Sequence, residues 1–328
     1  MIWKCPKCRG VLREQAAVLH CNACAAVFPV LDGIPDLRIP GLSWIDVEAD
    51  RAYAKRLLYE IKDAPPETWV RRVFTDQRPQ DSARIELRTQ QVMLGPGRLR
   101  NELAGWLEPS TSGTGLFLEI GCGPGALLAG AAAEGRQGIG IDVSIVWLLV
   151  AARLVRAFGG EPILAAALAE ALPLDDGAVT GVISLDVIEH VADPCVHLRE
   201  IDRVLASGGS VALSTPNRFS LSAEPHVFVW GVGWLPRKWQ KTFVRWRSRK
   251  PYDFVRLLSY CELRSLLRSE TRLNAEIIAP PIPGDEASLF SPRRALLAGV
   301  YNRLVSRRGW QSLFRRVGPF FRVAGRKY

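Results

Sequence analysis

Short apolar runs alternate with longer amphipathic stretches through the middle of the chain. The apolar runs fall at residues 117–120, 138–141, 162–166, 181–185 and 210–214. Because stretches of helical length separate them, the pattern predicts a parallel sheet with helices on both faces, the α/β doubly wound Rossmann-like class. In such sheets a ligand binds at the carboxyl ends of the strands. We therefore expect the functional residues at that edge.

The longest apolar stretch, residues 145–155, is interrupted by Arg153. It is too short to span a bilayer, so we interpret it as a helix that follows the second strand. The first residues, Met1 to Cys5, contain no apolar run of the kind that a signal peptide needs. These two features predict a cytoplasmic protein without a transmembrane segment.

Residues 40–97 are polar and charged, with Ala64-Pro65-Pro66 and Gly95-Pro96-Gly97 as predicted linkers around two helices. At 328 residues the chain is long for one domain. We expect a small module at 1–38, a helical linker at 39–107 and a catalytic domain at 108–328. We expect a helix from about Ser82 to Leu107.

A glycine turn follows the first predicted strand, in the segment Phe117 to Gly125. Glycines at 121, 123 and 125 let the backbone pass close under a ligand. Dinucleotide sites use the spacing G-x-G-x-x-G and bind a pyrophosphate, which Glu119 would repel. That carboxylate suits a ligand with an ammonium and a sulfonium group. The segment therefore favours S-adenosylmethionine.

The second predicted strand ends in Asp142, 17 residues after Gly125. A carboxylate at this position fits the two hydroxyls of a ribose. Dinucleotide sites share this feature. Asp142 therefore indicates a ribose but does not distinguish S-adenosylmethionine from a dinucleotide. That distinction rests on Glu119.

From about Gly115 to Asn217 the sequence resembles class I S-adenosylmethionine-dependent methyltransferases, through the glycine loop, Asp142 and the turn Leu172-Pro173-Leu174. Many members carry an acid before this turn that contacts the adenine amino group, whereas Leu168 stands there in this chain. Adenine would then be held by backbone groups near Ala169 and by apolar contact with Leu168. The resemblance implies cofactor contacts at Glu119, Gly121, Cys122, Gly123, Gly125, Asp142, Leu168, Ala169 and Asp186.

The ends of the fourth and fifth strands, residues 184–194 and 213–218, resemble the ubiquinone-biosynthesis type of O-methyltransferase. The Asn-Pro-Pro-Tyr type motif of adenine-amine methyltransferases is absent. Methylating a hydroxyl requires removal of its proton, and a histidine is suited to this near pH 7. His190 is the expected base, with Asp186 beside it and His226 as the rival.

Two other interpretations of this segment stay open. Asp186, Glu189 and His190 could bind a divalent cation that lowers the pKa of an acceptor hydroxyl, as the related pattern does in some quinone enzymes. Alternatively, Glu189 and His190 merely open the following helix, where an acid complements the helix dipole.

Four cysteines form two pairs, Cys5-x-x-Cys8 and Cys21-x-x-Cys24. This spacing predicts a closed tetrahedral Zn²⁺ site with a structural role. A module of this size has too little core to fold without such a site. The following segment, Phe28 to Pro35, resembles zinc-ribbon activator proteins of tRNA and rRNA methyltransferases, and ribbons fused to small-molecule methyltransferases. Residues 1–38 are therefore expected to form a zinc ribbon.

Basic and aromatic residues concentrate in two segments, 219–256 and 292–317. The chain carries a net charge of +10, and these segments make the charge local. Such a mixture serves nucleobase stacking beside phosphates or binding to a membrane surface. Alternatively, the aromatic rings simply line a pocket and the arginines are solvated on the surface. The tryptophans favour a membrane or a lipid-linked substrate over RNA.

The resemblance further implies that residues 319–327 form the last strand, inserted next to the sheet edge, with 292–317 as a helical insertion before it. In class I methyltransferases the helical segment before the glycine loop often covers the active site, so the helix from about Ser82 to Leu107 is either a lid or an ordinary packing helix. We expect O-methylation of a small-molecule, sugar or lipid-linked hydroxyl, in the cytoplasm or at the inner membrane face. The alternatives are an rRNA or tRNA methyltransferase and a non-catalytic, methyltransferase-like partner protein.

Overall fold

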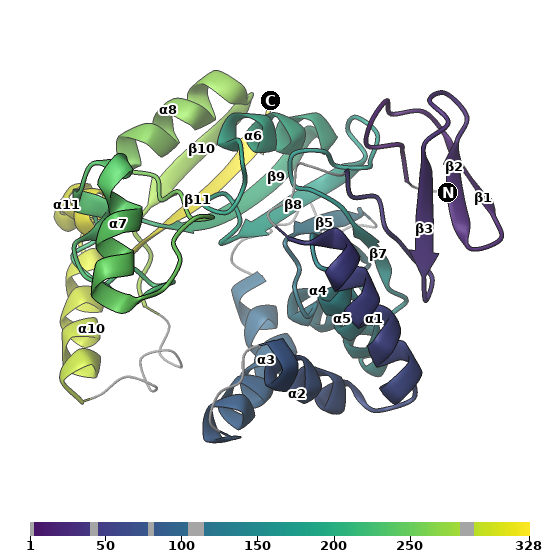
Figure 1. The fold of residues 1–328 in the computed structure, drawn as a ribbon. Helices are drawn as coiled ribbons and strands as arrows, with labels where there is room; N and C mark the ends of the chain where they lie inside the picture. The colour runs from purple at the N-terminus through teal and green to yellow at the C-terminus, as the bar shows by residue number, and fades with distance from the viewer. Residues whose placement is uncertain (1–2, 40–44, 78–81, 104–114, 283–291) are drawn as a thin grey trace.

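The computed structural model describes residues 3–39, 45–77, 82–103, 115–282 and 292–328. A seven-stranded sheet forms its centre, in the order β10-β11-β9-β8-β5-β6-β7 (Figure 1). Its strands are β5 (Phe117–Ile120), β6 (Gly138–Asp142), β7 (Ile163–Ala166), β8 (Val179–Leu185), β9 (Leu205–Pro216), β10 (Leu273–Ile278) and β11 (Phe320–Lys327). β11 pairs antiparallel with both of its neighbours, whereas β9, β8, β5, β6 and β7 pair parallel. The predicted α/β class is confirmed.

Helices cover both faces of this sheet (Figure 1). Along β5, Phe117 packs into one hydrophobic cluster with α4 and α5, whereas Leu118 and Ile120 pack into the other with α6 and α8. This alternation follows from the two-residue period of a strand. The helices are α1 (Val47–Ile61), α2 (Pro66–Gln77), α3 (Ser82–Leu103), α4 (Ala126–Ala132), α5 (Ile145–Ala157), α6 (Pro194–Val204), α7 (Arg237–Ser248), α8 (Tyr260–Glu270), α10 (Pro292–Val305) and α11 (Arg308–Val317). In the described ranges, none of them has the length and apolar character needed to cross a membrane.

The predicted linker at Gly95-Pro96-Gly97 is wrong, because α3 continues through it. A Cβ at Gly95 would stand 2.8 Å from the Cβ of Ala126, and one at Gly130 would stand 2.6 Å from the Pro96 carbonyl oxygen. The glycines therefore permit close packing of α3 on α4. Sequence alone did not distinguish this packing role from a turn. None of the described residues of α3 lines the cavity considered below, and its role as a lid stays a prediction.

The N-terminal module is an antiparallel sheet of β1 (Leu12–Gln15), β2 (Val18–Cys21), β3 (Val27–Leu31) and β4 (Ile34–Pro35). Directly after β4, Asp36 forms a parallel bridge with Ala166, and the Leu37 amide donates to the Ala166 carbonyl at 2.7 Å. The chain thus extends the large sheet beyond β7. Lys4 contacts the loop after β7, since its amide donates to the Pro173 carbonyl.

A buried ion network joins this module to the seven-stranded sheet. The Arg38 guanidinium donates to both carboxylate oxygens of Asp36, at 2.7 and 2.6 Å, and to Asp50 on α1 at 2.6 Å. It also donates to the Val143 carbonyl at 2.9 Å. The side chains of Arg38 and Asp36 are fully buried. The guanidinium therefore holds the chain after the ribbon against the turn that follows β6.

Asp50 completes the network from the side of the turn. Its carboxylate accepts hydrogen bonds from the Ser144 hydroxyl at 2.8 Å and the Ile145 amide at 2.9 Å. These groups start α5, directly after Asp142. The position of that turn thus depends on a carboxylate nearly a hundred residues earlier in the chain.

We predict that Asp50→Ala lowers the free energy of unfolding by about 3 kcal/mol or more, because removal of one partner leaves buried charge and polar groups unpaired. Glu67→Ala is the matched control. Its exposed ion pair with Arg71 should contribute less than about 1 kcal/mol. Urea denaturation of both variants measures the difference. Equal losses would show that the buried network does not have this structural role.

Candidate active site

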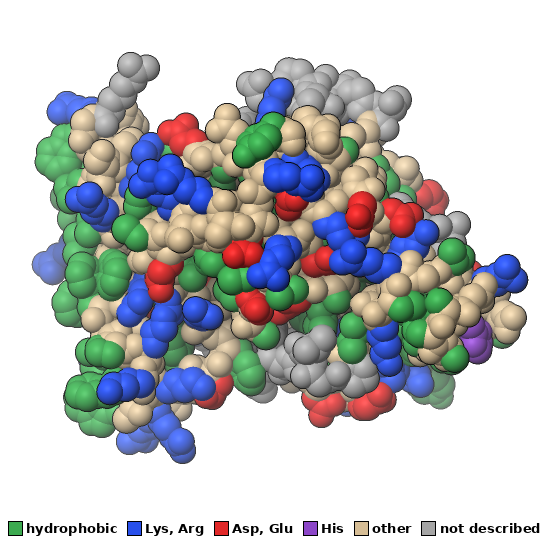
Figure 2. All heavy atoms as spheres, turned by 90° about the horizontal axis from the view of Figure 1, so that it is seen from above, with side chains coloured by type: hydrophobic (Ala, Val, Ile, Leu, Met, Phe, Trp, Pro, Cys, Tyr) green, Lys and Arg blue, Asp and Glu red, His purple; other side chains and the backbone are tan. Residues whose placement is uncertain are grey.

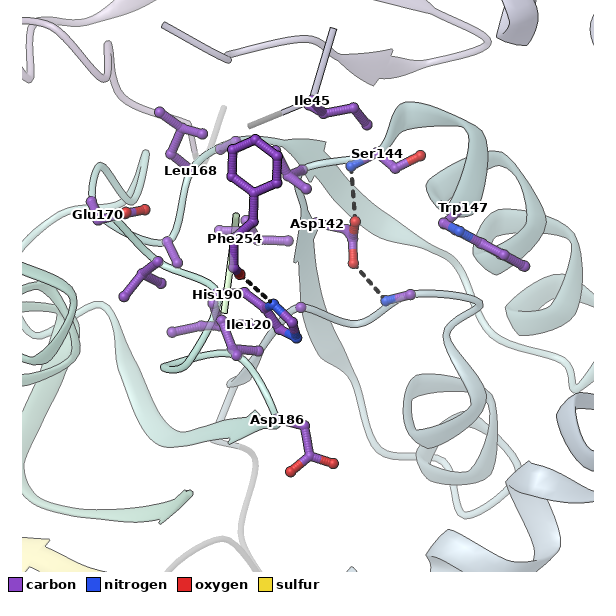
Figure 3. A pocket seen from close by; sticks show the side chains of 18 of the residues that line it. Ile45, Ile120, Asp142, Ser144, Trp147, Leu168, Glu170, Asp186, His190 and Phe254 are labelled. Atoms are coloured by element: carbon purple, nitrogen blue, oxygen red, sulfur yellow. Dashed lines mark hydrogen bonds between the residues drawn. The ribbon is translucent and has the colours of Figure 1, made fainter. Parts of the chain in front are cut away.

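A cavity of about 890 Å³ lies at the carboxyl ends of β5, β6, β7 and β8 (Figure 3). Asp253 and Phe254, from the segment after α7, also line it. The sequence-predicted residues among its lining are Gly121, Gly123, Asp142, Leu168, Ala169, Asp186 and His190. Glu119, Cys122, Gly125 and His226 do not line it.

The glycine loop turns sharply under this cavity. Gly123 has φ +49° and open space where a Cβ would stand, so its backbone faces the cavity without a side chain. Gly125 has φ +74°, and a Cβ there would stand 2.6 Å from the Cβ of Ala151. Only glycine adopts both arrangements without strain. Cys122 lies between Gly121 and Gly123, and its buried thiol is directed toward Gly140 rather than the cavity.

Asp142 fixes the loop to the end of β6. One carboxylate oxygen accepts from the Gly123 amide and the other from the Ser144 amide, both at 2.8 Å (Figure 3). Burial raises the pKa of Asp142 even though these amides stabilise its charge. Each oxygen keeps a second lone pair that can accept a hydrogen bond from a ligand hydroxyl.

Glu119 lies behind the loop as a buried carboxyl. Within the described structure, its Oε2 is buried and has no hydrogen-bond partner. Burial and the charge of Asp142 raise the pKa of Glu119 to about 8. Since an orphaned buried oxygen is costly, the position fits a ligand that brings a donor or a positive charge.

Leu168 and Ala169 form the wall after β7. The buried ring of His197 donates from Nδ1 to the Ala169 carbonyl, with the two atoms 3.2 Å apart. Burial lowers the pKa of His197 to about 4, so the ring is neutral. Glu170 adds a carboxylate to the same wall, which accepts from the Ala192 amide at 2.7 Å. His197 therefore has a structural role and supports this wall from behind.

His190 and His226 pack edge to face, with ring centroids 4.7 Å apart. The Nδ1 atom of His190 lies 3.0 Å from the Phe254 carbonyl oxygen (Figure 3). Because a carbonyl only accepts, Nδ1 carries the proton and Nε2 is the basic nitrogen. His226 donates from Nδ1 to Glu224 at 2.5 Å.

The environments of the two rings differ. Burial lowers the pKa of His190, although the Phe254 carbonyl acts in the opposite direction. Burial also disfavours charge on His226, but the Glu224 carboxylate outweighs it and raises the pKa above its ordinary value. The two rings therefore differ in their tendency to hold a proton.

Three possible metal ligands meet beside the cavity. One donor atom from each of Glu189, His190 and His226 lies within 4.8 Å of the others. Glu189 Oε1 is buried without a partner in the described structure, while Oε2 accepts from the Thr215 hydroxyl. The sequence analysis grouped Asp186 with Glu189 and His190, but here His226 completes the group. Asp186 instead accepts from the Ser214 hydroxyl at 2.9 Å, with its backbone at φ +54°.

The four ribbon cysteines form a second cluster. The Sγ atoms of Cys5 and Cys24 are 3.6 Å apart, and those of Cys8 and Cys21 are 3.4 Å apart. A tetrahedral zinc site with Zn–S bonds of about 2.3 Å places its sulfurs about 3.8 Å apart. The cluster therefore fits a Zn²⁺ ion with a small expansion.

Several cavity residues were missed by sequence reasoning. Asp253 and Phe254 are more than sixty residues from His190, and no local motif marks them. The contact of His226 with His190 joins residues that are 36 positions apart, and no local motif marks it either. Ser144 and Trp147, in contrast, open the helix after Asp142, and the motif could have indicated them.

Comparison with known proteins gives an independent view of this domain. Residues 118–213 match the family described as "Methyltransferase domain". A ubiquinone biosynthesis O-methyltransferase of Parvibaculum lavamentivorans is 33% identical over 131 residues, which cover 38% of this chain and 51% of that protein. The enzyme of the same name from Ruegeria pomeroyi is 31% identical over 152 residues, covering 46% and 57%. The chain spans about half the length of these curated relatives.

A probable S-adenosylmethionine-dependent methyltransferase of Mycobacterium tuberculosis is 37% identical over 105 residues, covering 32% of this chain and 37% of that protein. Among solved structures, a geranyl diphosphate C-methyltransferase from Streptomyces coelicolor is 19% identical, with a TM-score of 0.47, and the match covers 71% of this chain and 76% of that one. This structural similarity is weak, so the fold assignment rests on the strand order itself.

The strand order, with one reversed strand inserted next to the edge, and the glycine loop after β5 agree with the sequence match. Through residues 118–213, this chain is similar to class I S-adenosylmethionine-dependent methyltransferases.

Proposed function

We propose that the protein transfers the methyl group of S-adenosylmethionine to a hydroxyl of a small-molecule or lipid-linked acceptor. The observation that carries this proposal is the composition of the cavity. The glycine loop, Asp142 and His190 all line this one cavity. The relatives named for ubiquinone biosynthesis O-methylation support a hydroxyl as the acceptor.

In this proposal Asp142 accepts hydrogen bonds from the ribose hydroxyls. Glu119 interacts with the methionyl ammonium through the loop, and the open backbone at Gly123 admits the ligand. Leu168 contacts adenine as an apolar surface, with backbone groups near Ala169 in place of the acid that many relatives use. The residues behind these contacts, His197 and Asp50, keep the two walls in place.

Methyl transfer requires the acceptor oxygen in line with the leaving sulfur. The oxygen forms a bond to the methyl carbon as the carbon–sulfur bond breaks, and the electron pair of that bond stays on sulfur. The acceptor proton passes to Nε2 of His190. The products are a methyl ether and S-adenosylhomocysteine.

A second candidate mechanism uses a divalent cation held by Glu189, His190 and His226. The proximity of their donor atoms and the orphaned Glu189 oxygen favour it. A bound cation would lower the pKa of the acceptor hydroxyl. In that case Thr215 orients the Glu189 carboxylate and Glu224 orients the His226 ring.

We further propose that the cysteine cluster holds structural Zn²⁺. All four positions of the tetrahedron are cysteines, so a bound ion has no open position for chemistry. The ribbon shares its hydrophobic cluster with the catalytic sheet, through Cys5, Leu12 and Leu19. Its proposed role is to close the β7 edge.

Binding of S-adenosylhomocysteine should release a proton from Glu119. The carboxyl, with a pKa of about 8, is mostly protonated at pH 7, and the ligand ammonium favours its ionised form. Affinity should therefore rise between about pH 6 and pH 8, by at most about tenfold per pH unit. Calorimetry in buffers of different ionisation enthalpy measures the released proton. Glu119→Gln should bind more weakly and release none; a wild-type complex without proton release would contradict this role.

His190→Ala should lower turnover by about 100-fold or more while leaving the affinity for S-adenosylhomocysteine unchanged. The measurement is radiolabelled methyl transfer to an acceptor found by screening phenols, sugars and lipid-linked alcohols. Cys261→Ser, at an exposed position on α8, is the control. Undiminished turnover in the alanine variant would exclude His190 from the chemistry.

The cation candidate predicts that Mn²⁺ alone binds to the zinc-loaded protein, as measured by calorimetry. Glu189→Gln and His226→Gln should each weaken this binding at least about tenfold, because each removes one ligand. The zinc content of the ribbon, measured in parallel, should not change. If Mn²⁺ does not bind, the cation mechanism is excluded, and the metal-free mechanism with His190 as base remains.

A further inference from the structure

The segment between β9 and α8 carries large apolar side chains that are exposed to solvent. We define the aromatic–basic surface by Leu221, Phe228, Trp230, Trp234, Trp239 and Trp246, all of which are exposed. Trp246 keeps 75% of its surface in contact with solvent and Phe228 keeps 73%. Single exposed rings are common, but a cluster of this kind marks an interaction site.

The local fold explains why these rings face outward. The segment has a small core of its own, in which Val227, Val229, Val232, Val244 and Tyr252 pack together. Helix α7 contributes Val244 to it and also buries Gln240. Trp239 and Trp246 are seven residues apart and therefore share another face of the helix. Core packing thus accounts for one face of α7 and leaves the tryptophan face uncovered.

Two of the rings are fixed in place by their polar atoms. The Trp230 indole donates to the Leu221 carbonyl at 3.1 Å, and the Trp234 indole donates to the Ser220 carbonyl at 3.2 Å. The Leu221 amide in turn donates to the Val317 carbonyl at the end of α11. The ring faces therefore remain exposed without an unpaired donor, and the surface is continuous with α11.

Cations without acidic partners surround the rings. Arg237 pairs with Glu262 and Lys241 with Asp253. The other exposed cations from 238 to 256 have no carboxylate partner among the described residues: Lys238, Arg245, Arg247, Arg249, Lys250 and Arg256. The charge of this surface is thus available to an external anion.

A groove of about 480 Å³ lies within the aromatic–basic surface. Val227, Phe228, Trp230 and Trp246 line it, and Arg247 is also among its lining residues. Its apolar lining next to a cation matches an amphiphile with an acyl chain and an anionic head.

The neighbouring helices continue the pattern. On α10, Leu296, Leu297 and Val300 are exposed, and on α11 Trp310 and Leu313 are exposed. Figure 2 shows hydrophobic side chains along the left margin, the side of α7, α10 and α11 in Figure 1, with Lys and Arg side chains beside them.

We propose that the aromatic–basic surface docks on a bilayer that contains anionic phospholipid. Its rings and Leu221 would lie at the headgroup level, and its unpaired cations would contact lipid phosphates. RNA would use rings and cations, but stacking has no use for the exposed leucines and valine of α10. The mixture of aliphatic, aromatic and basic side chains therefore favours a lipid surface.

The surface adjoins the reaction cavity. Lys241 on α7 pairs with Asp253 at 3.0 Å, and Asp253 and Phe254 line the cavity. Docking would thus bring the cavity close to the membrane, where a lipid-linked acceptor can enter. This consequence rests on the proposed function, whereas docking itself does not.

Cosedimentation of the zinc-loaded full chain with vesicles tests the proposal. One set contains phosphatidylcholine alone, and the other contains equal parts of phosphatidylcholine and phosphatidylglycerol. We expect binding to the anionic vesicles that weakens with salt. Trp239→Ser with Trp246→Ser should lower the affinity at least about tenfold, and so should Lys238→Glu with Arg245→Glu and Arg247→Glu.

Matched controls alter exposed positions elsewhere. Tyr59→Ser with Leu94→Ser removes comparable apolar surface, and Arg13→Glu with Lys55→Glu and Arg264→Glu makes the same change in net charge. Both should keep the vesicle affinity, and every variant should keep its affinity for S-adenosylhomocysteine, which separates failed docking from a failed cofactor site. The proposal is overturned if the wild-type protein does not bind anionic vesicles or binds neutral vesicles equally well. It is also overturned if the control variants lose as much vesicle affinity as the surface variants. A loss of affinity only for a single-stranded RNA oligomer, with vesicle binding unchanged, would overturn it as well.

Discussion

The hydrogen bonds of the buried Arg38 guanidinium are the interaction on which the arrangement of the ribbon, α1 and the large sheet depends. The guanidinium forms ion pairs with Asp36 after the ribbon and Asp50 on α1, and it donates to the Val143 carbonyl next to Asp142. Burial alone would raise the pKa of Asp36, but Arg38 and Arg51 outweigh it and hold the pKa below its ordinary value. Three separate parts of the chain therefore meet at one cation, and the cofactor edge of the sheet is built from all of them.

Burial also determines the character of the site. The carboxyls of Glu119 and Asp142 both have raised pKa values, so the cofactor-free site disfavours their combined negative charge. A ligand with positive charge relieves this, which a pyrophosphate does not. The Phe254 carbonyl sets the tautomer of His190 and leaves Nε2 as the basic atom. His190 therefore belongs to both proposed mechanisms, as the base in one and as a metal ligand in the other.

Sequence reasoning found what is encoded locally. The apolar runs predicted the strands from β5 to β9, and the glycine turn and Asp142 were placed at the cavity because their spacing reflects one strand–turn–helix unit. It named His226 as a candidate base but did not predict its contact with His190. It also did not find Asp253 or Phe254, because these contacts join segments far apart in the chain. It also misinterpreted Gly95 to Gly97 as a linker, since close helix packing and a turn both use glycine. The Arg38 network was invisible, because no motif marks a buried arginine.

Titration calorimetry with S-adenosylmethionine, S-adenosylhomocysteine and NAD tests the central claim most directly. Our account predicts micromolar binding of the two sulfur ligands and none of NAD. Asp142→Ala should lose that binding while retaining its fold, as checked by urea denaturation. Binding of NAD in preference to the sulfur ligands, or no binding of either sulfur ligand by the wild-type protein, would contradict the account.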